Sequence, residues 1–130
     1  TVTSRGRNSS SAGFSALEAG ASATVVSAVA AAVARMEARI DAPESVSETA
    51  AAVGLSPRRL ESLFRSALGL SPGAFALSLR LQAARRMVTD TTHPMAEIAL
   101  RCGFSSQSTL TRAFARRFGQ PPSAMRQLRR

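Results

Sequence analysis

Two stretches of the chain carry the same arrangement of residues. The first is AAVGLSPRRLESLFRSALGLSP, residues 51–72, and the second is LRCGFSSQSTLTRAFARRFGQPP, residues 100–122. Each has a Gly near its start, a Ser two positions later, Leu and Phe at helical spacing, and a closing Gly followed by Pro. The shared residues predict two copies of one structural unit. The polar residues that differ between the copies are candidates for a specific function.

Each copy predicts a short helix, a tight turn and a longer helix. Ala50 lies four residues before Gly54, and Ala99 lies four residues before Gly103. A small Ala lets the second helix cross close to the first, and Gly supplies the positive φ that the turn requires. Two copies with this spacing, each followed by an amphipathic helix that bears Arg, indicate a pair of helix-turn-helix units.

The rest of the chain is predicted to be helical as well, because no run of alternating β-branched residues appears. We expect an all-α fold with helices over about residues 22–40, 46–53, 56–68, 72–89, 94–102 and 105–118, and a last short helix with Met125 and Leu128, which makes seven. The first helix-turn-helix then spans about 45–69, a linker helix about 72–89 and the second unit about 94–119. Residues 1–21, rich in Ser, Gly and Ala, are expected to be a flexible tail or an interdomain linker before a domain over 22–130.

Apolar residues at helical spacing predict which helix faces are buried. The first helix carries the stripe Val25, Val29, Val33, Met36 and Ile40, and the linker helix carries Phe75, Leu79, Leu81, Ala84 and Val88.

The positive charge of the chain is concentrated in the repeats. The net charge is +9, from 17 basic and 8 acidic residues, and every basic residue is Arg. Residues 53–130 hold thirteen Arg and three acids, a balance of +10, against −1 for residues 1–52. Such a field attracts nucleic acid or an anionic membrane surface, although a basic face that only keeps the protein in solution is the alternative. The apolar stretch from Ala19 to Ala34 is shorter than the roughly 20 residues that a membrane span needs, so no membrane partner is expected.

The exposed faces of the two longer helices carry Arg and small polar residues rather than a mixture of charges. These groups are able to enter a groove of DNA and hydrogen-bond to base edges, and Arg residues further along each helix would lie within reach of phosphates. The predicted faces hold Arg58, Arg59, Glu61, Ser62 and Arg65 in the first unit, and Gln107, Ser108, Thr111, Arg112 and Arg116 in the second.

At this level of detail the sequence resembles a known family. Two segments resemble the DNA-binding domain of AraC/XylS-type bacterial transcription regulators. They are AAVGLSPRRLESLFRSALGLSP, residues 51–72, and LRLQAARRMVTDTTHPMAEIALRCGFSSQSTLTRAFARRFGQPPSAMR, residues 79–126. The resemblance covers about Val25 to Arg126 and is most specific in EIALRCGFSSQSTLTRAFARRFGQPPSAMR. It implies seven helices, two helix-turn-helix units on a linker helix, and sequence-specific binding of double-stranded promoter DNA in the bacterial cytoplasm, as an activator or a repressor.

The resemblance also implies roles for individual residues. It assigns base contacts to Arg58, Glu61, Ser62, Gln107, Ser108, Thr111 and Arg112, and phosphate contacts to Arg59, Arg65, Arg101, Ser106, Thr109 and Arg116. Glu61 departs from the basic pattern: it could accept a hydrogen bond from a cytosine amino group, or it could pair with Arg58 or Arg65. Arg80, Arg85 and Arg86 on the linker helix stay open between a role toward DNA and a solvated surface charge.

Other functions have less support in the sequence. One His and one Cys are too few for a zinc site, no cofactor is expected, and no Ser/His/Asp set or carboxylate pair suggests an enzyme. His93 is expected to be a loop or cap residue, and Cys102 a small core residue. The alternative to DNA as the partner of the basic face is a protein, either RNA polymerase or an acidic protein. An N-terminal effector or dimerisation domain is a further expected partner.

Overall fold

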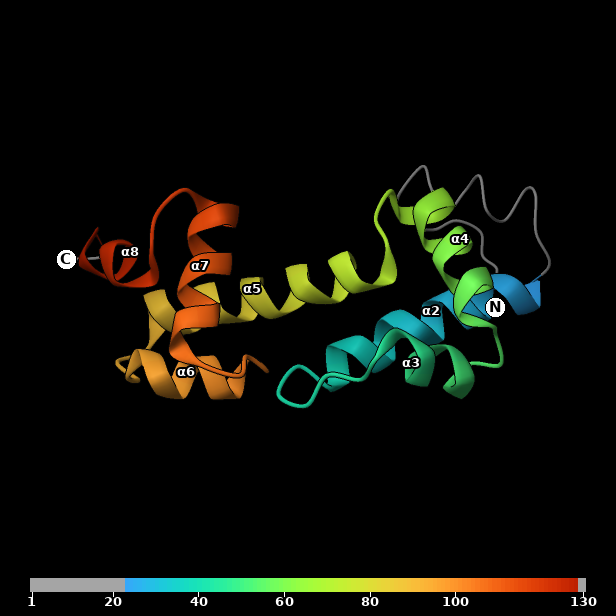
Figure 1. Ribbon diagram of the computed structural model, residues 1–130, viewed down its shortest axis with the longest axis horizontal. Helices are drawn as coiled ribbons and strands as arrows, with labels where there is room; N and C mark the ends of the chain where they lie inside the picture. The colour runs from blue at the N-terminus through green and yellow to red at the C-terminus, as the bar shows by residue number, and fades with distance from the viewer. Residues whose placement is uncertain (1–22, 129–130) are drawn as a thin grey trace. The chain divides into compact units, whose positions relative to one another are not determined.

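The computed structural model describes residues 23–128, with side chains from Val26 onward, and the expected tail over residues 1–21 lies outside this range. Within these residues the chain forms seven α-helices and no strand, so the all-α prediction is confirmed. The helices are α2 (Ala23–Ala38), α3 (Val46–Ala52), α4 (Pro57–Leu68), α5 (Pro72–Asp90), α6 (Met95–Arg101), α7 (Gln107–Phe118) and α8 (Pro122–Leu128), labelled in Figure 1.

Local capping interactions set the helix ends. Ser45 and Glu48 form a reciprocal capping box at α3, with N···O distances of 2.9 and 3.1 Å. The Ser56 hydroxyl accepts from the Arg59 amide at the start of α4, and Gly69 ends that helix at φ +77°. α7 begins at Gln107 instead of near residue 105, because Ser106 is the residue whose hydroxyl caps it.

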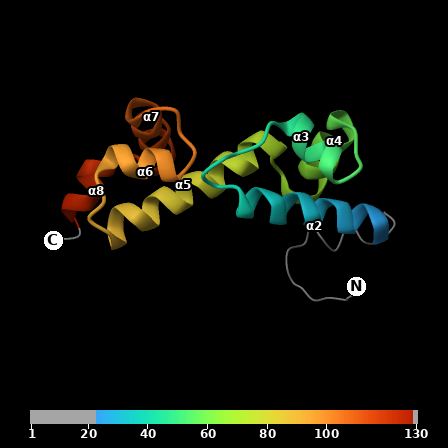
Figure 2. The same cartoon turned by 90° about the horizontal axis from the view of Figure 1, so that it is seen from below.

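The first of two compact units contains α2, α3, α4 and the first residues of α5. Figure 2 shows α3 and α4 beside α2, and their buried side chains are Val29, Ala32, Ala50, Leu60, Leu63, Phe64 and Ala67. The ring of Phe75, at the start of α5, meets Phe64 edge to face at 5.7 Å between centroids. Two aromatic rings and a shell of aliphatic side chains therefore hold the first helix-turn-helix against α2.

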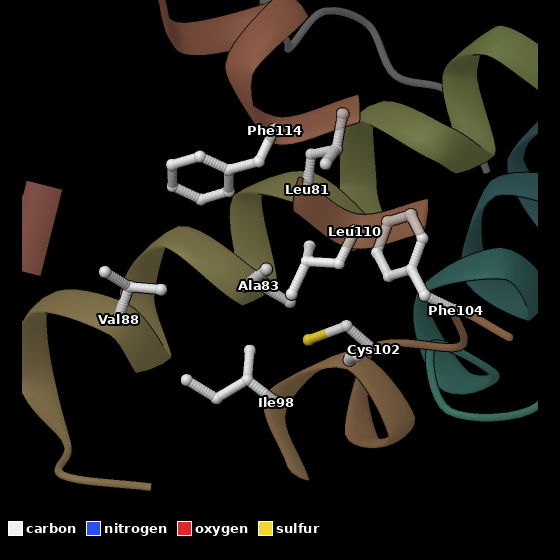
Figure 3. Packing of buried hydrophobic residues seen from close by; sticks show 10 residues of the cluster. Leu81, Ala83, Val88, Ile98, Cys102, Phe104, Leu110 and Phe114 are labelled. Atoms are coloured by element: carbon white, nitrogen blue, oxygen red, sulfur yellow. The ribbon is translucent and has the colours of Figure 1, made fainter. Parts of the chain in front are cut away.

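The second unit contains residues 39–43 and the chain from Ala76 onward. α5, α6 and α7 surround its core, where the side chains labelled in Figure 3 point toward one another. The buried residues are Leu81, Ala83, Ala84, Val88, Ile98, Ala99, Cys102, Phe104, Leu110 and Phe114. The apolar faces of α6 and α7 are thus used to pack the helix-turn-helix on the linker helix, which leaves their polar faces outward.

Two core predictions are corrected by the structure. The stripe of the first helix was expected to end at Ile40, but α2 ends at Ala38 and Ile40 packs against the core of the second unit. A turn in which the Ala42 amide donates to the Arg39 carbonyl redirects the chain there. On the linker helix Leu79 is only half-buried, and Leu77 packs against the second core instead. Val25, the first residue of the stripe, has a side chain outside the described range.

Candidate nucleic-acid interface

The outer face of α4 presents the residues expected to contact DNA in the first unit. Leu60, Leu63, Phe64 and Ala67 are buried, so the opposite side of this two-sided helix faces solvent. All five predicted residues of this unit are exposed: Arg58, Arg59, Glu61, Ser62 and Arg65.

Glu61 lies close to Arg65 on this face. An Nη atom of Arg65 is 3.5 Å from a carboxylate oxygen of Glu61, one helical turn away. Both side chains are more than half exposed, and such an exposed pair contributes at most about 1 kcal/mol to stability. The structure therefore contains the ion pair of Glu61 with Arg65, and the contact of Glu61 with a cytosine amino group stays a prediction.

In the second unit, the polar residues expected to read DNA lie together on the first two turns of α7. Gln107, Ser108, Thr111 and Arg112 line one surface hollow of about 340 Å³. Leu110 and Phe114, between and beyond them in the sequence, are buried in the core. The helix is therefore fixed by one side and offers amide, hydroxyl and guanidinium groups on the other, which are the groups that hydrogen-bond to base edges in a major groove.

Ser106 and Thr109 have a structural role in addition to the phosphate contacts expected of them. The Ser106 hydroxyl accepts from the Thr109 amide at 3.1 Å, and the two side-chain oxygens are 2.9 Å apart. Together they cap the N-terminus of α7. A helix N-terminus attracts anions, so a phosphate at this end would meet the hydroxyl groups and the free amides of the first turn.

The Arg residues expected to contact phosphates differ in their surroundings. Arg101 on α6 is paired with Glu97, with one Nη 2.6 Å from the carboxylate, so a phosphate would have to compete with that acid. Arg116 is exposed near the end of α7. Arg117 and Arg85 hold their guanidinium groups 5.8 and 5.2 Å from the centre of the Phe118 ring. Arg85, left open by the sequence, thus stacks on α7 instead of extending alone into solvent.

Two Arg residues that sequence reasoning did not single out as structural bind backbone carbonyls. Arg80 on α5 donates to the carbonyls of Cys102 and Gly103 at 3.1 and 2.9 Å. Arg126 on α8 donates to those of Met87, Val88, Thr91 and His93 at 2.7–3.4 Å, around the end of α5. Their partners lie between 22 and 39 residues away in sequence, so no local pattern could have revealed them.

The remaining chemistry-bearing residues are part of the scaffold. Cys102 is fully buried, as expected, and burial raises the pKa of its thiol, an effect that the nearby guanidinium groups of Arg80 and Arg86 oppose. His93 lies in the loop before α6, where its amide donates to the Thr91 hydroxyl. Among the residues that the structure describes, no cluster of His, Cys, Asp or Glu could hold a metal ion. No helix in this part of the chain is both long and apolar enough to cross a bilayer.

Comparison with known proteins agrees with this geometry. A family model described as a helix-turn-helix domain matches residues 49–128. A crystal structure of a transcriptional regulator with an AraC-type DNA-binding domain from Chromobacterium violaceum superposes with a TM-score of 0.76 at 36% identity, over 83% of this chain and 96% of that one. The chain belongs to the AraC-type helix-turn-helix family. AraC-type domains are parts of transcription regulators, so this is not a family of enzymes.

Two further relatives of this AraC-type chain show what such domains are part of. The DNA-binding domain of AdpA, crystallised in complex with a target DNA, has a TM-score of 0.74 at 30% identity, over 77% of this chain and 90% of that one. The transcriptional regulator ArgR of Pseudomonas aeruginosa is 39% identical over 95 residues, which are 73% of this chain and 29% of that protein. The chain spans about a third or less of the length of the curated relatives it matches.

Proposed function

We propose that this chain binds double-stranded promoter DNA sequence-specifically, with α4 and α7 entering successive major grooves. The observation that carries the proposal is the outer face of α7, where Gln107, Ser108, Thr111 and Arg112 line one hollow on a helix whose other face is buried. The residues of α4 occupy corresponding positions after the first Gly turn. The family relationship to regulators, one of them solved with its target DNA, supports the same conclusion.

The two units are expected to contribute differently. The reading face of α7 has one Arg among three uncharged polar side chains, which suits hydrogen bonds to particular base edges. The face of α4 has Arg58, Arg59 and Arg65 around a single acid, which suits contact with phosphates. We therefore assign most of the sequence discrimination to α7 and a larger share of the salt-dependent affinity to α4. The two helix-turn-helix units are linked by α5, whose 19 residues extend about 28 Å at 1.5 Å per residue.

The chain is best understood as one part of a longer regulator. It spans 25–32% of the length of the first curated relatives, which supports an additional effector or dimerisation domain in the whole protein. RNA polymerase is the further partner that a promoter-bound regulator would meet, and the bacterial cytoplasm, at the nucleoid, is the expected place of action.

The test is selection of bound duplexes from a random DNA pool, followed by titration against the selected duplex and a scrambled one of the same composition. We expect log Kd to change steeply with log salt for both, because the exposed Arg residues displace counterions from phosphates. At equal salt the selected duplex should bind more tightly, as specific sites do by three or more orders of magnitude in typical regulators. Equal affinity for both at every salt concentration would contradict specific reading and would identify sequence-independent binding to phosphates.

A further inference from the structure

The turn between α6 and α7 is held from outside by a side chain of the linker helix. The guanidinium group of Arg80 donates through Nε to the Cys102 carbonyl at 3.1 Å and through Nη2 to the Gly103 carbonyl at 2.9 Å. The same group lies 4.5 Å from the centre of the Phe104 ring. Three consecutive residues of the turn therefore contact one planar group. Arg80 is half-buried, and this burial lowers the pKa of its guanidinium, which nevertheless stays charged.

The carbonyls that Arg80 binds lie at the C-terminal end of α6, where Cys102 is the cap residue and Gly103 follows it. The last carbonyls of any α-helix have no amide within the helix to accept from, and α6 has only seven residues. A cation at this end also interacts favourably with the helix dipole. The inner side of the turn is closed by its own backbone, where the Phe104 amide donates to the Ala99 carbonyl at 2.8 Å. Arg80 completes the outer side.

The space around the turn leaves it little freedom. A Cβ atom added to Gly103 would lie 2.5 Å from the Ile40 carbonyl oxygen, 2.8 Å from Cδ of Pro43 and 3.1 Å from Nε of Arg80. The equivalent turn of the first unit is open, since a Cβ at Gly54 would have no neighbour within 4 Å. The two helix-turn-helix units share a sequence pattern, but only the second has its turn enclosed.

We propose that Arg80 is a positioning residue for DNA recognition, which fixes the α6–α7 turn so that α7 presents its reading face in one orientation. It acts on the bases through the turn and not by contact with DNA. The proposal rests on the function proposed above. α7 begins three residues after Phe104, so a change in the conformation of the turn alters the orientation of α7 and of Gln107 and its neighbours.

The alternative role for an Arg on the linker helix is contact with a phosphate, and the two roles respond differently to Lys. A phosphate contact needs a positive charge, which Lys supplies. The turn needs two parallel donors and a flat face against a ring, which the ammonium group of Lys lacks. Arg80→Lys therefore separates the two roles, and Arg80→Met removes both charge and donors while keeping a side chain of similar length. Arg86→Met is the matched control, because Arg86 is exposed on the same helix and its loss changes the charge equally.

The first measurement uses the duplex selected by the wild-type chain, varied one base pair at a time. The base pairs read by α7 are those at which Gln107→Ala or Arg112→Ala relaxes the preference. We expect Arg80→Met and Arg80→Lys each to reduce discrimination at those base pairs about fivefold or more. Discrimination at the half-site bound by α4 should stay within about twofold of wild type. The slope of log Kd against log salt should not change. Arg86→Met should leave discrimination at both half-sites intact.

Two results of this titration would overturn the proposal. A salt slope lower by about 0.9 in Arg80→Met, with recovery in Arg80→Lys, would identify a phosphate contact. A lower melting temperature with unchanged discrimination at the α7 base pairs would identify a role in stability alone.

The second measurement needs no DNA. Amide hydrogen exchange should be faster in Arg80→Met than in wild type at Phe104 and Thr109, which lie in the turn and the first turn of α7, and unchanged in Arg86→Met. Wild-type protection at both amides in Arg80→Met would contradict the proposal whatever the binding data show. If the wild-type chain selects no DNA sequence, the proposed function fails and the reading role of Arg80 fails with it, while exchange still shows whether Arg80 holds the turn.

Discussion

Replacement of Gly103 by Ala tests whether the turn of the second unit is as enclosed as its geometry indicates. Gly103 has φ +80°, and an added Cβ would lie 2.5 Å from the backbone oxygen of Ile40. Gly119, in the same unit, has φ +84° and would gain a Cβ with nothing within 4 Å. Both substitutions place an L-residue in the left-handed conformation, which costs about 1–2 kcal/mol. Only Gly103→Ala adds a contact that backbone atoms must move to relieve, which costs about 1–3 kcal/mol more.

The comparison is made by urea and thermal unfolding of the two variants and the wild type. We expect Gly103→Ala to lower the free energy of unfolding by about 2–5 kcal/mol and Gly119→Ala by about 1–2 kcal/mol. A difference of 1 kcal/mol corresponds to about 4–8 °C in melting temperature for a domain of this size. Equal losses in the two variants would show that only the backbone conformation matters and that the segment from Ile40 to Pro43 does not press on the turn.

Three further predictions concern a helix end, a buried thiol and the reading face. Arg126→Ala leaves the carbonyls at the end of α5 without their donor and should lower the free energy of unfolding by about 1–3 kcal/mol, whereas Arg116→Ala should change it by less than about 0.5 kcal/mol. Burial raises the pKa of the Cys102 thiol, so above about pH 8.5 the unfolded chain releases a proton that the folded chain keeps, and stability falls as pH rises. The chain has no Tyr and no Lys, so Cys102→Ala should flatten the decline in stability above about pH 8.5. Arg112→Ala should weaken binding to the selected duplex by about 1–3 kcal/mol and relax the preference at one base pair.

Each of these predictions has an outcome that contradicts it. Unfolding data in which Arg126→Ala matches Arg116→Ala would mean that water replaces the lost donor at no net cost. An alkaline decline in stability that survives in Cys102→Ala would have to come from another group. If Arg112→Ala weakens binding to every duplex alike and lowers the salt slope by about 0.9, Arg112 contacts a phosphate and its assignment as a reading residue is wrong.

Local sequence rules predicted the helices and the outward faces of α4 and α7 well, for identifiable reasons. Ser45 with Glu48, and Ser56 before Pro57, form caps through atoms three residues apart, which a sequence displays directly. The buried Leu110 and Phe114 follow from helical periodicity, and the same periodicity leaves Gln107, Ser108, Thr111 and Arg112 outward. The pairing of Glu61 with Arg65 was one of two local possibilities, and only side-chain geometry could choose between them.

The predictions that failed or were missing depend on contacts between distant parts of the chain. Ile40 continues the spacing of the first helix, yet it lies beyond the end of α2 and packs on the second core. Arg80 and Arg126 look like surface charges in the sequence, and they prove to be donors to carbonyls at helix ends 22–39 residues away. Whether the guanidinium group of an Arg is free to contact DNA thus depends on which backbone carbonyls lie beside it in the folded chain.

Local patterns in the chain are enough to predict a pair of helix-turn-helix units with an Arg-rich outer surface, because caps, glycine turns and apolar spacing act over three or four residues. The same patterns also predict which side chains of α4 and α7 face outward, since these are the positions that the apolar period leaves out. The difference between the two turns becomes visible only in the folded chain. The turn at Gly54 is open, and the turn at Gly103 is enclosed by Ile40, Pro43 and Arg80, because burying the second turn brings together a loop, a helix and a guanidinium group that no local pattern connects.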